Sequence, residues 1–364
     1  MQKTHSNRLR TAIVGCGKVA DTHALAYREL PNSEFVAACS NSPQRAQAFA
    51  AKWGANGYAD LAQMLDREKV DVLSVCTPHT QHPSAVEIAA AAGVHAIVEK
   101  PLAVDLVSCD RAIAAARAAG VKLGVISQRR WYEPVRRMKE AIDAGKLGKP
   151  VLILVQMLGW REPSYYLSDP WRGTWAGEGG GVVVSQAPHY LDLLSWFMGP
   201  AIDLHGYWDN YNHPSIEVDD SVVASVRFEN GGMGSIVLSN SQRPGLFGKI
   251  HVHGSSGSSV GAEIDSGSPF ISGVTATMDP PFNDIWTIPG EESKLELWNR
   301  EDRSRPWDVM THYHKVQVAD FLDAVSEDRK PLVGAEDGRR VVELFTAIYR
   351  SQLEHASQHL PLPQ

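Results

Sequence analysis

The stretch LRTAIVGCGKVADTHALAYREL, residues 9–30, decides the fold of the first third of this chain. A short apolar run ends in glycine, and a segment with helical spacing follows it. Gly15, Gly17 and Ala20 form a G-x-G-x-x-G/A pattern. The first glycine permits a tight turn, the second lets a pyrophosphate approach the backbone, and the alanine lets helix and strand pack closely. Because the pattern follows a predicted strand and opens a predicted helix, it predicts a dinucleotide-binding turn.

Predicted strands and helices alternate throughout the first 130 residues. The strands, among them residues 70–78 and 94–101, are continuous apolar runs without polar alternation, which is typical of a parallel sheet covered on both faces. Repeated strand–helix units of this length predict a doubly wound α/β fold. From residue 131 onward the pattern changes, and residues 221–241 predict a hairpin that turns at 230–232, as in an antiparallel sheet.

Length and composition exclude several classes of protein. The 364 residues suit two domains, and a formal net charge of -7 gives no attraction to a phosphate backbone, so we expect no nucleic-acid partner. The 4 scattered cysteines predict reduced core residues instead of a disulfide framework. We find no signal peptide and no apolar run of ~18–20 residues, so we expect a cytoplasmic protein with no membrane partner.

The second predicted strand leaves the type of nicotinamide cofactor open. An NAD-selective site usually presents Asp or Glu about 20 residues after the glycines, but this chain has Ser40-Asn41-Ser42 there. No carboxylate would repel a 2′-phosphate, and the nearby cation, Arg45, lies within a predicted helix. The expected cofactor is therefore NAD or NADP, with NAD favoured.

Four motifs follow one another in a specific order: the glycine turn at 15–20, CTPHTQH at 76–82, Glu99-Lys100-Pro101, and GGGVVVSQAPHYLD at 179–192. Together they resemble the glucose-fructose oxidoreductase / inositol dehydrogenase (Gfo/Idh/MocA) family, and the similarity spans nearly the whole chain. The resemblance implies an N-terminal Rossmann domain and a C-terminal α/β domain with a large open, mostly antiparallel sheet. It also implies oxidation or reduction of a ring hydroxyl on a sugar or inositol.

The resemblance divides the chain into two domains. We expect an NAD(P)-binding Rossmann domain in residues 1–130 and a substrate-binding and oligomerisation domain in residues 131–364. One face of the second domain's sheet would pack on helices, and the other would form the interface of a homodimer or homotetramer. The other expected partner is a small-molecule sugar or glycoside.

Two residues are the candidates for acid–base chemistry. Lys100 follows the carboxyl end of a predicted strand, where ligands collect in open α/β sheets, and the resemblance places it on the reacting hydroxyl. For Lys100 to act as a base near neutrality, its pKa must fall by about 3 from the unperturbed ~10.4, which burial and a positive nicotinamide favour. His189 lies near the start of a helix that Pro188 opens and Gly199 ends. The resemblance makes His189 the main proton donor or acceptor.

The chain departs from the inositol dehydrogenase pattern at one position. That pattern has an Asp four residues before the histidine, and this chain has Ser185 there. A serine holds no negative charge, so we expect the carboxylate-assisted relay to be missing and inositol dehydrogenation to be disfavoured. The glycines at 179–181 are expected to let the backbone pass close to cofactor and sugar.

Further candidates line the predicted cofactor and substrate sites. Residues expected at the cofactor are Gly15, Gly17, Lys18, Val19, Ser40, Asn41, Arg45, Thr77, Pro78, His82, Glu99, Lys100, Gln128, Trp171 and Arg172. Residues expected at the substrate are Lys100, Arg129, Tyr132, Tyr166, Arg172, Ser185, His189 and Asp192. Aromatic rings stack on pyranose faces and arginine binds anions, but we expect at least half of the aromatic residues in 165–175 to pack in the core.

No metal site is expected. His251 and His253 are two apart on a predicted strand, so they share one face of it. No carboxylate partner is evident for them in the sequence, and the pair is therefore interpreted as part of a packed strand.

Three functions fit these residues. The leading hypothesis is an NAD(P)-dependent oxidoreductase that removes a hydride from a pyranose ring carbon, with C3 as the favoured position. In it His189 takes the hydroxyl proton and Lys100 polarises the oxygen. The alternative is an NAD-dependent glycosidase that oxidises C3 transiently, eliminates the aglycone, adds water and returns the hydride. Its substrate would be an acidic or sulfonated glycoside, like that of a sulfoquinovosidase. The third is a sugar- or cofactor-sensing protein, which has no need of an acid–base pair.

Overall fold

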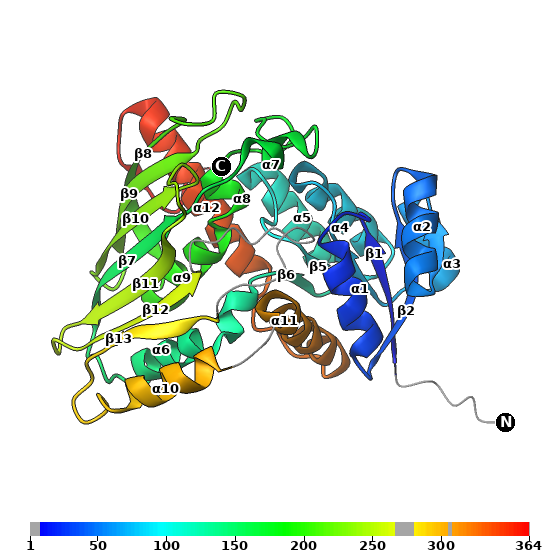
Figure 1. Cartoon of the computed structure of the whole chain (residues 1–364). Helices are drawn as coiled ribbons and strands as arrows, with labels where there is room; N and C mark the ends of the chain where they lie inside the picture. Colours follow the sequence, from blue (N-terminus) through cyan, green and yellow to red (C-terminus); the bar gives the residue numbers. More distant parts are fainter. Residues whose placement is uncertain (1–7, 266–279, 305–307, 364) are drawn as a thin grey trace. The chain divides into compact units, whose positions relative to one another are not determined.

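The computed structural model describes residues 8–265, 280–304 and 308–363 (Figure 1). By its internal contacts the chain forms two compact units. The first unit contains Met1–Ala103, Val107–Ile126 and His314–Arg339, and the second contains Val104–Leu106, Ser127–Tyr313 and Arg340–Gln364. The expected division into domains 1–130 and 131–364 stays a prediction. The internal contacts group the later segment His314–Arg339 with the first unit.

A six-stranded parallel sheet forms the centre of the first unit. Its strands are β1 (Leu9–Val14), β2 (Ser33–Cys39), β3 (Asn56–Tyr58), β4 (Val72–Val75), β5 (His95–Val98) and β6 (Leu123–Val125). They pair in the order β3-β2-β1-β4-β5-β6, and every pairing among them is parallel. The strand order reverses between β1 and β4, and ligands of open α/β sheets bind at such a point, beyond the carboxyl ends of the strands. The predicted doubly wound parallel sheet is confirmed.

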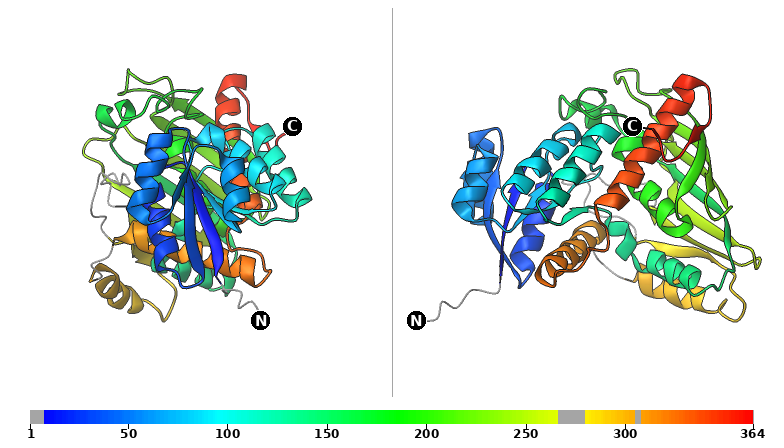
Figure 2. Two further views of the ribbon diagram at one scale, coloured as in Figure 1. Left: turned by 90° about the vertical axis from the view of Figure 1, so that its right-hand side faces the viewer. Right: turned by 180° about the vertical axis from the view of Figure 1, so that it is seen from behind.

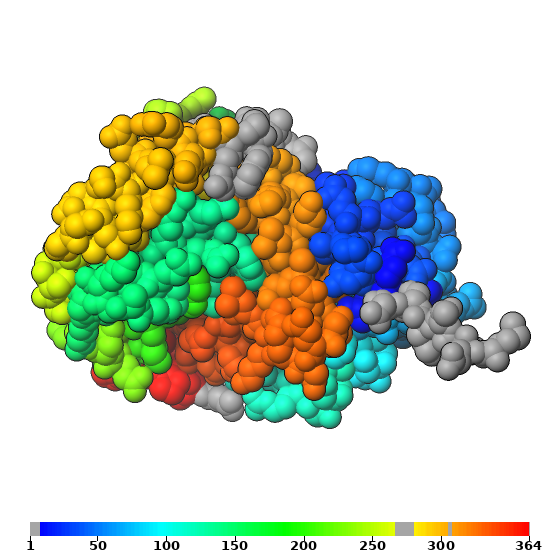
Figure 3. Space-filling view, turned by 90° about the horizontal axis from the view of Figure 1, so that it is seen from below, coloured from blue at the N-terminus to red at the C-terminus, as the bar shows by residue number. Residues whose placement is uncertain are grey.

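The helices of this unit come from both ends of the chain. They are α1 (Ala20–Glu29), α2 (Pro43–Trp53), α3 (Leu61–Glu68), α4 (His82–Ala91), α5 (Leu106–Ala118) and the greater part of α11 (Val309–Ser326). Phe321 of α11 lies in one buried cluster with Ile13 of β1 and Ile97 of β5. Lys315 Nζ also lies 2.6 Å from Glu29 Oε2 of α1, and Figure 3 shows the orange atoms of this segment against the blue atoms of the N-terminal segment. A late segment of the chain thus completes the core of the N-terminal sheet.

The second unit is built on an eight-stranded sheet. Its strands are β7 (Pro150–Leu158), β8 (Ala201–Asp209), β9 (Ser221–Phe228), β10 (Met233–Ser239), β11 (Phe247–Gly254), β12 (Ser259–Asp265), β13 (Phe282–Trp286) and β14 (Gln358–His359). The order is β13-β12-β11-β7-β10-β9-β8-β14, and of these pairings β7 with β10 is parallel while the others are antiparallel. The predicted hairpin is β9–β10, closed by a Phe228 N–H bond to the Gly232 carbonyl at 3.0 Å. The predicted open, mostly antiparallel sheet is confirmed.

One face of this sheet is buried and the other is exposed. In β9, Val222, Ala224 and Val226 are buried, whereas Val223 between them is 53% exposed. The helices are α6 (Glu133–Asp143), α7 (Pro163–Leu167), α8 (Val182–Ser185), α9 (Pro188–Met198), α10 (Lys294–Arg303) and most of α12 (Ala335–Glu354). Figure 2 shows the red helix α12 along the β8 edge, where Ser351 Oγ accepts the Gly206 N–H at 3.1 Å. No helix in the described ranges is both long and apolar enough to cross a membrane.

Candidate active site

The turn between β1 and α1 contains two glycines under different constraints. Gly15 has a φ of +91°, and a Cβ there would lie 2.5 Å from the carbonyl carbon of Cys76, just beyond β4, so the protein's own packing requires glycine. A Cβ built on Gly17 meets no atom of the described residues within 4 Å. The fold therefore accounts for the first glycine and leaves an open space at the second.

The start of α1 beside Gly17 has the character of an anion site. Val19 occupies the N-cap position, and no side chain caps the helix there. Backbone N–H groups at a helix start carry partial positive charge and attract anions. Lys18 is exposed and Val19 is half-buried in the same turn. These features fit the pyrophosphate of a dinucleotide, which the backbone around Gly17 and the first turn of α1 would hold.

The residues predicted near the ribose meet at the end of β2. Ser40 is buried, and its Oγ accepts the Ser42 N–H at 3.3 Å. Ser42 in turn caps α2 by accepting the Arg45 N–H at 3.3 Å. Asn41 and Arg45 are exposed beside this cap. The structure therefore brings Ser40, Asn41 and Arg45 together, and their contact with a ribose stays a prediction.

His82 joins the segments that follow β4 and β5. Its buried ring lies between two carbonyl oxygens, with Nε2 2.8 Å from that of Thr77 and Nδ1 2.7 Å from that of Pro101. Both ring nitrogens thus face the protein's own backbone. We therefore assign His82 to holding Thr77 and Pro78 beside Lys100-Pro101. A cofactor contact by His82, Thr77 or Pro78 stays a prediction.

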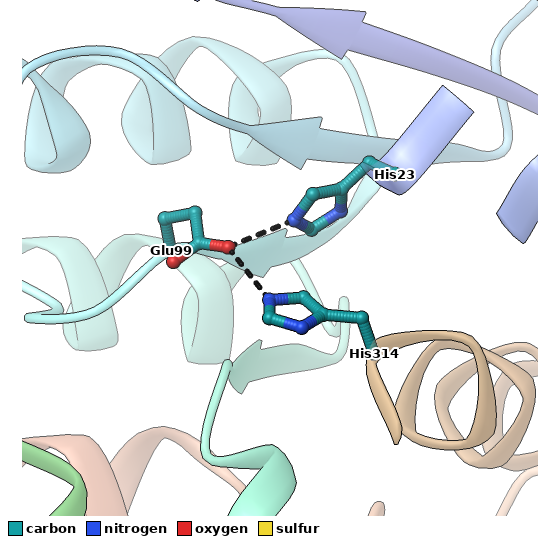
Figure 4. Close-up of side chains that lie close together, drawn as sticks. All are labelled: His23, Glu99 and His314. Atoms are coloured by element: carbon teal, nitrogen blue, oxygen red, sulfur yellow. Dashed lines mark hydrogen bonds and ion pairs between the residues drawn. The ribbon is translucent and has the colours of Figure 1, made fainter. Parts of the chain in front are cut away.

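Glu99 sits in a buried cluster that precedes Lys100 (Figure 4). Its Oε1 lies 3.0 Å from His23 Nε2 and 3.3 Å from His314 Nε2, and its Oε2 accepts the Lys100 backbone N–H at 3.2 Å. Burial raises the pKa of Glu99, but the hydrogen bonds from the two histidines outweigh it and hold that pKa well below its usual range. The carboxylate is therefore ionised, and it fixes the backbone of Lys100 at the end of β5.

The same cluster is the one group of histidine and acidic side chains in the described residues close enough together to bind a metal ion. Hydrogen bonds already account for its facing atoms, and they continue from His23 Nδ1 to Ser74 Oγ at 2.9 Å. Burial lowers the pKa of His23, as expected for a neutral ring in a hydrogen-bonded chain. His23 and His314 were not among the site residues predicted from the sequence. The available signal was a histidine on the otherwise small and apolar face of α1.

The glycine run at 179–181 packs against the second unit itself. A Cβ on Gly181 would overlap the Asp219 carbonyl oxygen, and one on Gly180 would overlap the Tyr349 hydroxyl. Asp219 Oδ1 accepts the Gly181 N–H at 2.8 Å, and its Oδ2 accepts the Val183 N–H at 3.2 Å. Protein atoms thus occupy the space that a side chain would take at Gly180 and Gly181, and the expected approach of this backbone to cofactor and sugar stays a prediction. The two glycines tie the segment before His189 to the sheet.

Ser185 has a carboxylate partner that the sequence analysis did not find. Its Oγ donates to Glu178 Oε1 at 2.5 Å, and Glu178 Oε2 accepts the Gly173 N–H at 2.6 Å. Gln186 Nε2 donates to Ser185 Oγ at 3.1 Å. Ser185, one turn before His189, is therefore hydrogen-bonded to the Glu178 carboxyl group, and the expected absence of a carboxylate-assisted relay at Lys100 and His189 stays a prediction.

His189 lies in the first turn of α9 and is 5% exposed. Pro188 opens that helix and Gly199 follows its last residue, as predicted. Asp192, one turn further on, is engaged within the protein: Arg130 pairs with it at 2.6 Å and 2.8 Å, and Ser127 Oγ also donates to it. This pair fixes α9, and a substrate contact by Asp192 stays a prediction.

In the aromatic segment 165–175 some rings pack in the core and others contact the Arg172 guanidinium. Tyr166 is buried against Ile216 and Val218, with Tyr165 partly buried beside them, whereas Trp175 is 39% exposed. Arg172 Nη1 donates to the Tyr165 hydroxyl at 2.5 Å, and its guanidinium lies 4.5 Å from the centre of the Trp171 ring. Contacts of Arg172 and Trp171 with a ligand stay predictions.

Gln128, Tyr132 and His251 all have partners within the protein. Gln128 Nε2 donates to Met310 Sδ at 3.0 Å, and the buried Tyr132 ring packs on Tyr313. His251 Nε2 lies 2.8 Å from Asp284 Oδ2 on β13. The statement that this histidine has no carboxylate partner is thereby corrected, because strand pairing brings Asp284 beside it from 33 residues away. The described part of the chain shows no metal-binding cluster around it.

His213 links the loop between β8 and β9 to the segment after β7. Its Nδ1 lies 2.9 Å from Asp220 Oδ2, and its Nε2 lies 2.8 Å from the Arg161 carbonyl oxygen. Burial lowers the pKa of His213, but these two hydrogen bonds outweigh it and raise that pKa above its usual 6.5. The ring therefore holds Arg161 in place.

Comparison with known proteins gives the same picture for both halves of the chain. Residues 9–127 match the family described as "Oxidoreductase family, NAD-binding Rossmann fold", and residues 135–260 match the GFO/IDH/MocA C-terminal domain. The crystal structure of the WlbA dehydrogenase from Bordetella pertussis, in complex with NADH and UDP-GlcNAcA, is 30% identical. It covers 98% of this chain and 99% of its own, with a TM-score of 0.87.

Two curated relatives match over shorter stretches. The D-glucoside 3-dehydrogenase of Escherichia coli K12 is 29% identical over 63% of this chain and 69% of its own length. The D-apiose dehydrogenase of Paraburkholderia graminis is 35% identical over 40% of each chain. Because both domain families match and a structural relative aligns along nearly its full length, the chain belongs to the Gfo/Idh/MocA family of NAD-binding oxidoreductases.

Proposed function

We propose that the protein is an NAD-dependent dehydrogenase that oxidises a ring hydroxyl, at C3, of a pyranose derivative. The observation that carries the proposal is the open space at Gly17 beside the uncapped start of α1, which fits a dinucleotide. A 3-dehydrogenase of glucosides among the relatives supports the position, and the structural relative solved with NADH and UDP-GlcNAcA supports the cofactor and the substrate type. When bound, the nicotinamide supplies the hydride acceptor.

We assign the acid–base chemistry to Lys100 and His189. The Lys100 backbone is anchored by the ionised Glu99 carboxylate at the end of β5. Its ammonium would bind and polarise the substrate hydroxyl oxygen. His189, in the first turn of the fixed helix α9, would accept the proton from that hydroxyl.

The test is a comparison of Lys100→Met and His189→Ala with two control variants. Lys330→Met and His359→Ala remove the same residue types from exposed positions. We expect both active-site variants to lose about 10²- to 10⁴-fold in turnover and to keep NAD binding, while the controls behave as wild type. Turnover like that of the wild type in either active-site variant would reject the assignment.

Assays of NAD reduction and aglycone release on the same purified protein distinguish the dehydrogenase from the two other functions. Aglycone release that needs catalytic NAD without net reduction would establish the redox-neutral glycosidase. NAD binding without turnover of any sugar or glycoside would establish a sensor. We propose NAD as the physiological cofactor over NADP, because no cation other than Arg45 was found in the sequence near Ser40-Asn41.

A further inference from the structure

We propose that Arg129 and Arg161 form a binding site for an oxyanion of the substrate, so that the enzyme acts on acidic pyranose derivatives. The inference rests on the proposed function and adds the chemical class of the substrate. Both arginines belong to the second unit, which also contains His189.

Arg129 is a largely buried cation with donors to spare. Its Nη2 lies 2.7 Å from Asp265 Oδ2, and its side chain is 11% exposed. Its Nε and Nη1 are buried and make no hydrogen bond of normal geometry with the described residues, although the guanidinium interacts with the Tyr190 and Tyr132 hydroxyls. Because a guanidinium carries five N–H donors and buried donors are nearly always satisfied, Arg129 offers donors that a ligand oxygen would accept.

Arg161 has the same deficit and forms no ion pair with an acidic side chain of the described residues. Its Nη1 donates to the Trp160 carbonyl at a long 3.4 Å, and its buried Nε has no acceptor among the residues that the structure describes. Burial lowers the pKa of Arg161 more than the neighbouring Tyr165, Tyr166 and Asp265 side chains raise it. An arginine stays protonated in proteins, so this charge calls for an anion.

The backbone around Arg161 is held from both sides. Its N–H donates to the Asn240 carbonyl at 3.1 Å, and its carbonyl oxygen lies 2.8 Å from His213 Nε2. The guanidinium lies 5.6 Å from the centre of the Tyr165 ring. Arg161 is therefore a positioned side chain on a fixed segment after β7, unlike a mobile arginine on the surface.

Asp265, the ion-pair partner of Arg129, also acts electrostatically on Arg161, and it is linked to helix α9, which contains His189. Asp265 raises the pKa of Arg129 and also acts on Arg161. The Tyr190 hydroxyl donates to Asp265 Oδ2 at 2.7 Å, and the Arg129 guanidinium lies 4.6 Å from the centre of the Tyr190 ring. Tyr190 directly follows His189 in α9. A second negative charge would balance the pair of cations beside the start of that helix.

The chemistry selects an oxyanion over a neutral hydroxyl. A hydroxyl oxygen would satisfy one N–H, but it would leave the charge of Arg161 uncompensated. A carboxylate, phosphate or sulfonate satisfies several guanidinium donors at once and supplies the charge. All three groups would be recognised by the same guanidinium donors, so the experiment compares one sugar of each kind.

The experiment measures sugar binding by calorimetry with the NADH-loaded protein. The probes are D-glucose, D-glucuronate, glucose 6-phosphate and 6-sulfo-glucose. We expect at least one acidic probe to bind about 10- to 100-fold more tightly than glucose, as for hydrogen bonds to a charged group, and the tightest one identifies the oxyanion. Arg161→Met should abolish this preference.

Two controls keep the outcome interpretable. Arg243→Gln removes an exposed cation, 70% exposed and 3.7 Å from Glu162, and should retain the preference. The thermal midpoint of Arg161→Met should equal or exceed that of the wild type, because no described carboxylate loses its ion pair. Equal binding of glucose and all three acids, or an acid preference that survives Arg161→Met, would overturn the proposal. Binding is measured apart from turnover, so failure of the dehydrogenase assignment would show separately as tight acid binding without NAD reduction.

Discussion

Replacing Gly17 by alanine tests whether the turn after β1 is shaped for a ligand. In the structure a Cβ at this position meets no described atom within 4 Å, and the glycine has no left-handed φ that would disfavour alanine. The protein without cofactor should therefore tolerate the methyl group. A dinucleotide pyrophosphate that approaches the backbone here would not, because the methyl group would occupy the space of its closest oxygens.

The two effects have opposite signs, and each has an expected size. A glycine-to-alanine change at a compatible backbone position stabilises a fold by about 0.4–1 kcal/mol through the unfolded chain. Forcing one extra carbon into a filled contact costs about 1–3 kcal/mol, so the dissociation constant for NAD should rise roughly 5- to 150-fold. Gly17→Ala is thus predicted to raise the thermal midpoint of the apoprotein slightly while weakening NAD binding.

Calorimetric titration with NAD and thermal unfolding without cofactor measure both quantities. Gly334→Ala is the matched control, because a Cβ there meets Asp337 Oδ2 at an ordinary 3.9 Å in the same unit. Gly15→Ala is the opposite case: its Cβ would lie 2.5 Å from the Cys76 backbone, so the apoprotein itself should lose stability. Wild-type NAD affinity in Gly17→Ala, or a large loss of apoprotein stability, would refute the reasoning.

Three further predictions concern the cluster beside the lysine, a pH effect and the assembly. Glu99→Gln should lower the free energy of unfolding by about 1–3 kcal/mol and reduce turnover, because an amide replaces the ionised acceptor that faces the Lys100 N–H; a wild-type thermal midpoint would contradict this. Because the folded pKa of His213 is raised, its stabilisation is present below pH ~6.5 and is lost as the pH rises through the folded pKa. The thermal midpoint of the wild type should therefore fall more between pH 6 and pH 9 than that of His213→Gln; parallel pH profiles would count against it. Tyr207, 62% exposed and paired with the exposed Val223, should lie in a dimer interface, so Tyr207→Arg should give a monomer in analytical ultracentrifugation where the wild type gives a dimer or tetramer.

Sequence patterns predicted the fold because its signals are local. The glycine turn, the apolar runs and the turn at 230–232 each lie within a few residues, and the structure confirms the parallel sheet and the mostly antiparallel sheet that they predict. The bounds of α9 follow in the same way from Pro188 and Gly199. Local chemistry, however, did not indicate that residues from α11 complete the core of the first unit.

The contacts that were not predicted from the sequence join residues that are distant in the chain, or near residues whose spacing fits neither a helical nor a strand repeat. His314 reaches Glu99 across 215 positions, and Asp265 reaches Arg129 between two separate segments. Glu178 lies only seven residues before Ser185, but a loop and a short helix bring them together, and no periodic pattern covers that geometry. Pairings of this kind depend on tertiary packing, so they become visible only in the structure.

The stoichiometry of a single reaction tests the central claim most directly. Purified protein is mixed with NAD and a panel of neutral and acidic pyranoses and chromogenic glycosides, and reduced nicotinamide and released aglycone are recorded together. We predict one NADH per sugar oxidised, no aglycone release, and loss of this signal in His189→Ala. Aglycone release without net NADH, or NADH formation that persists in His189→Ala, would contradict the account.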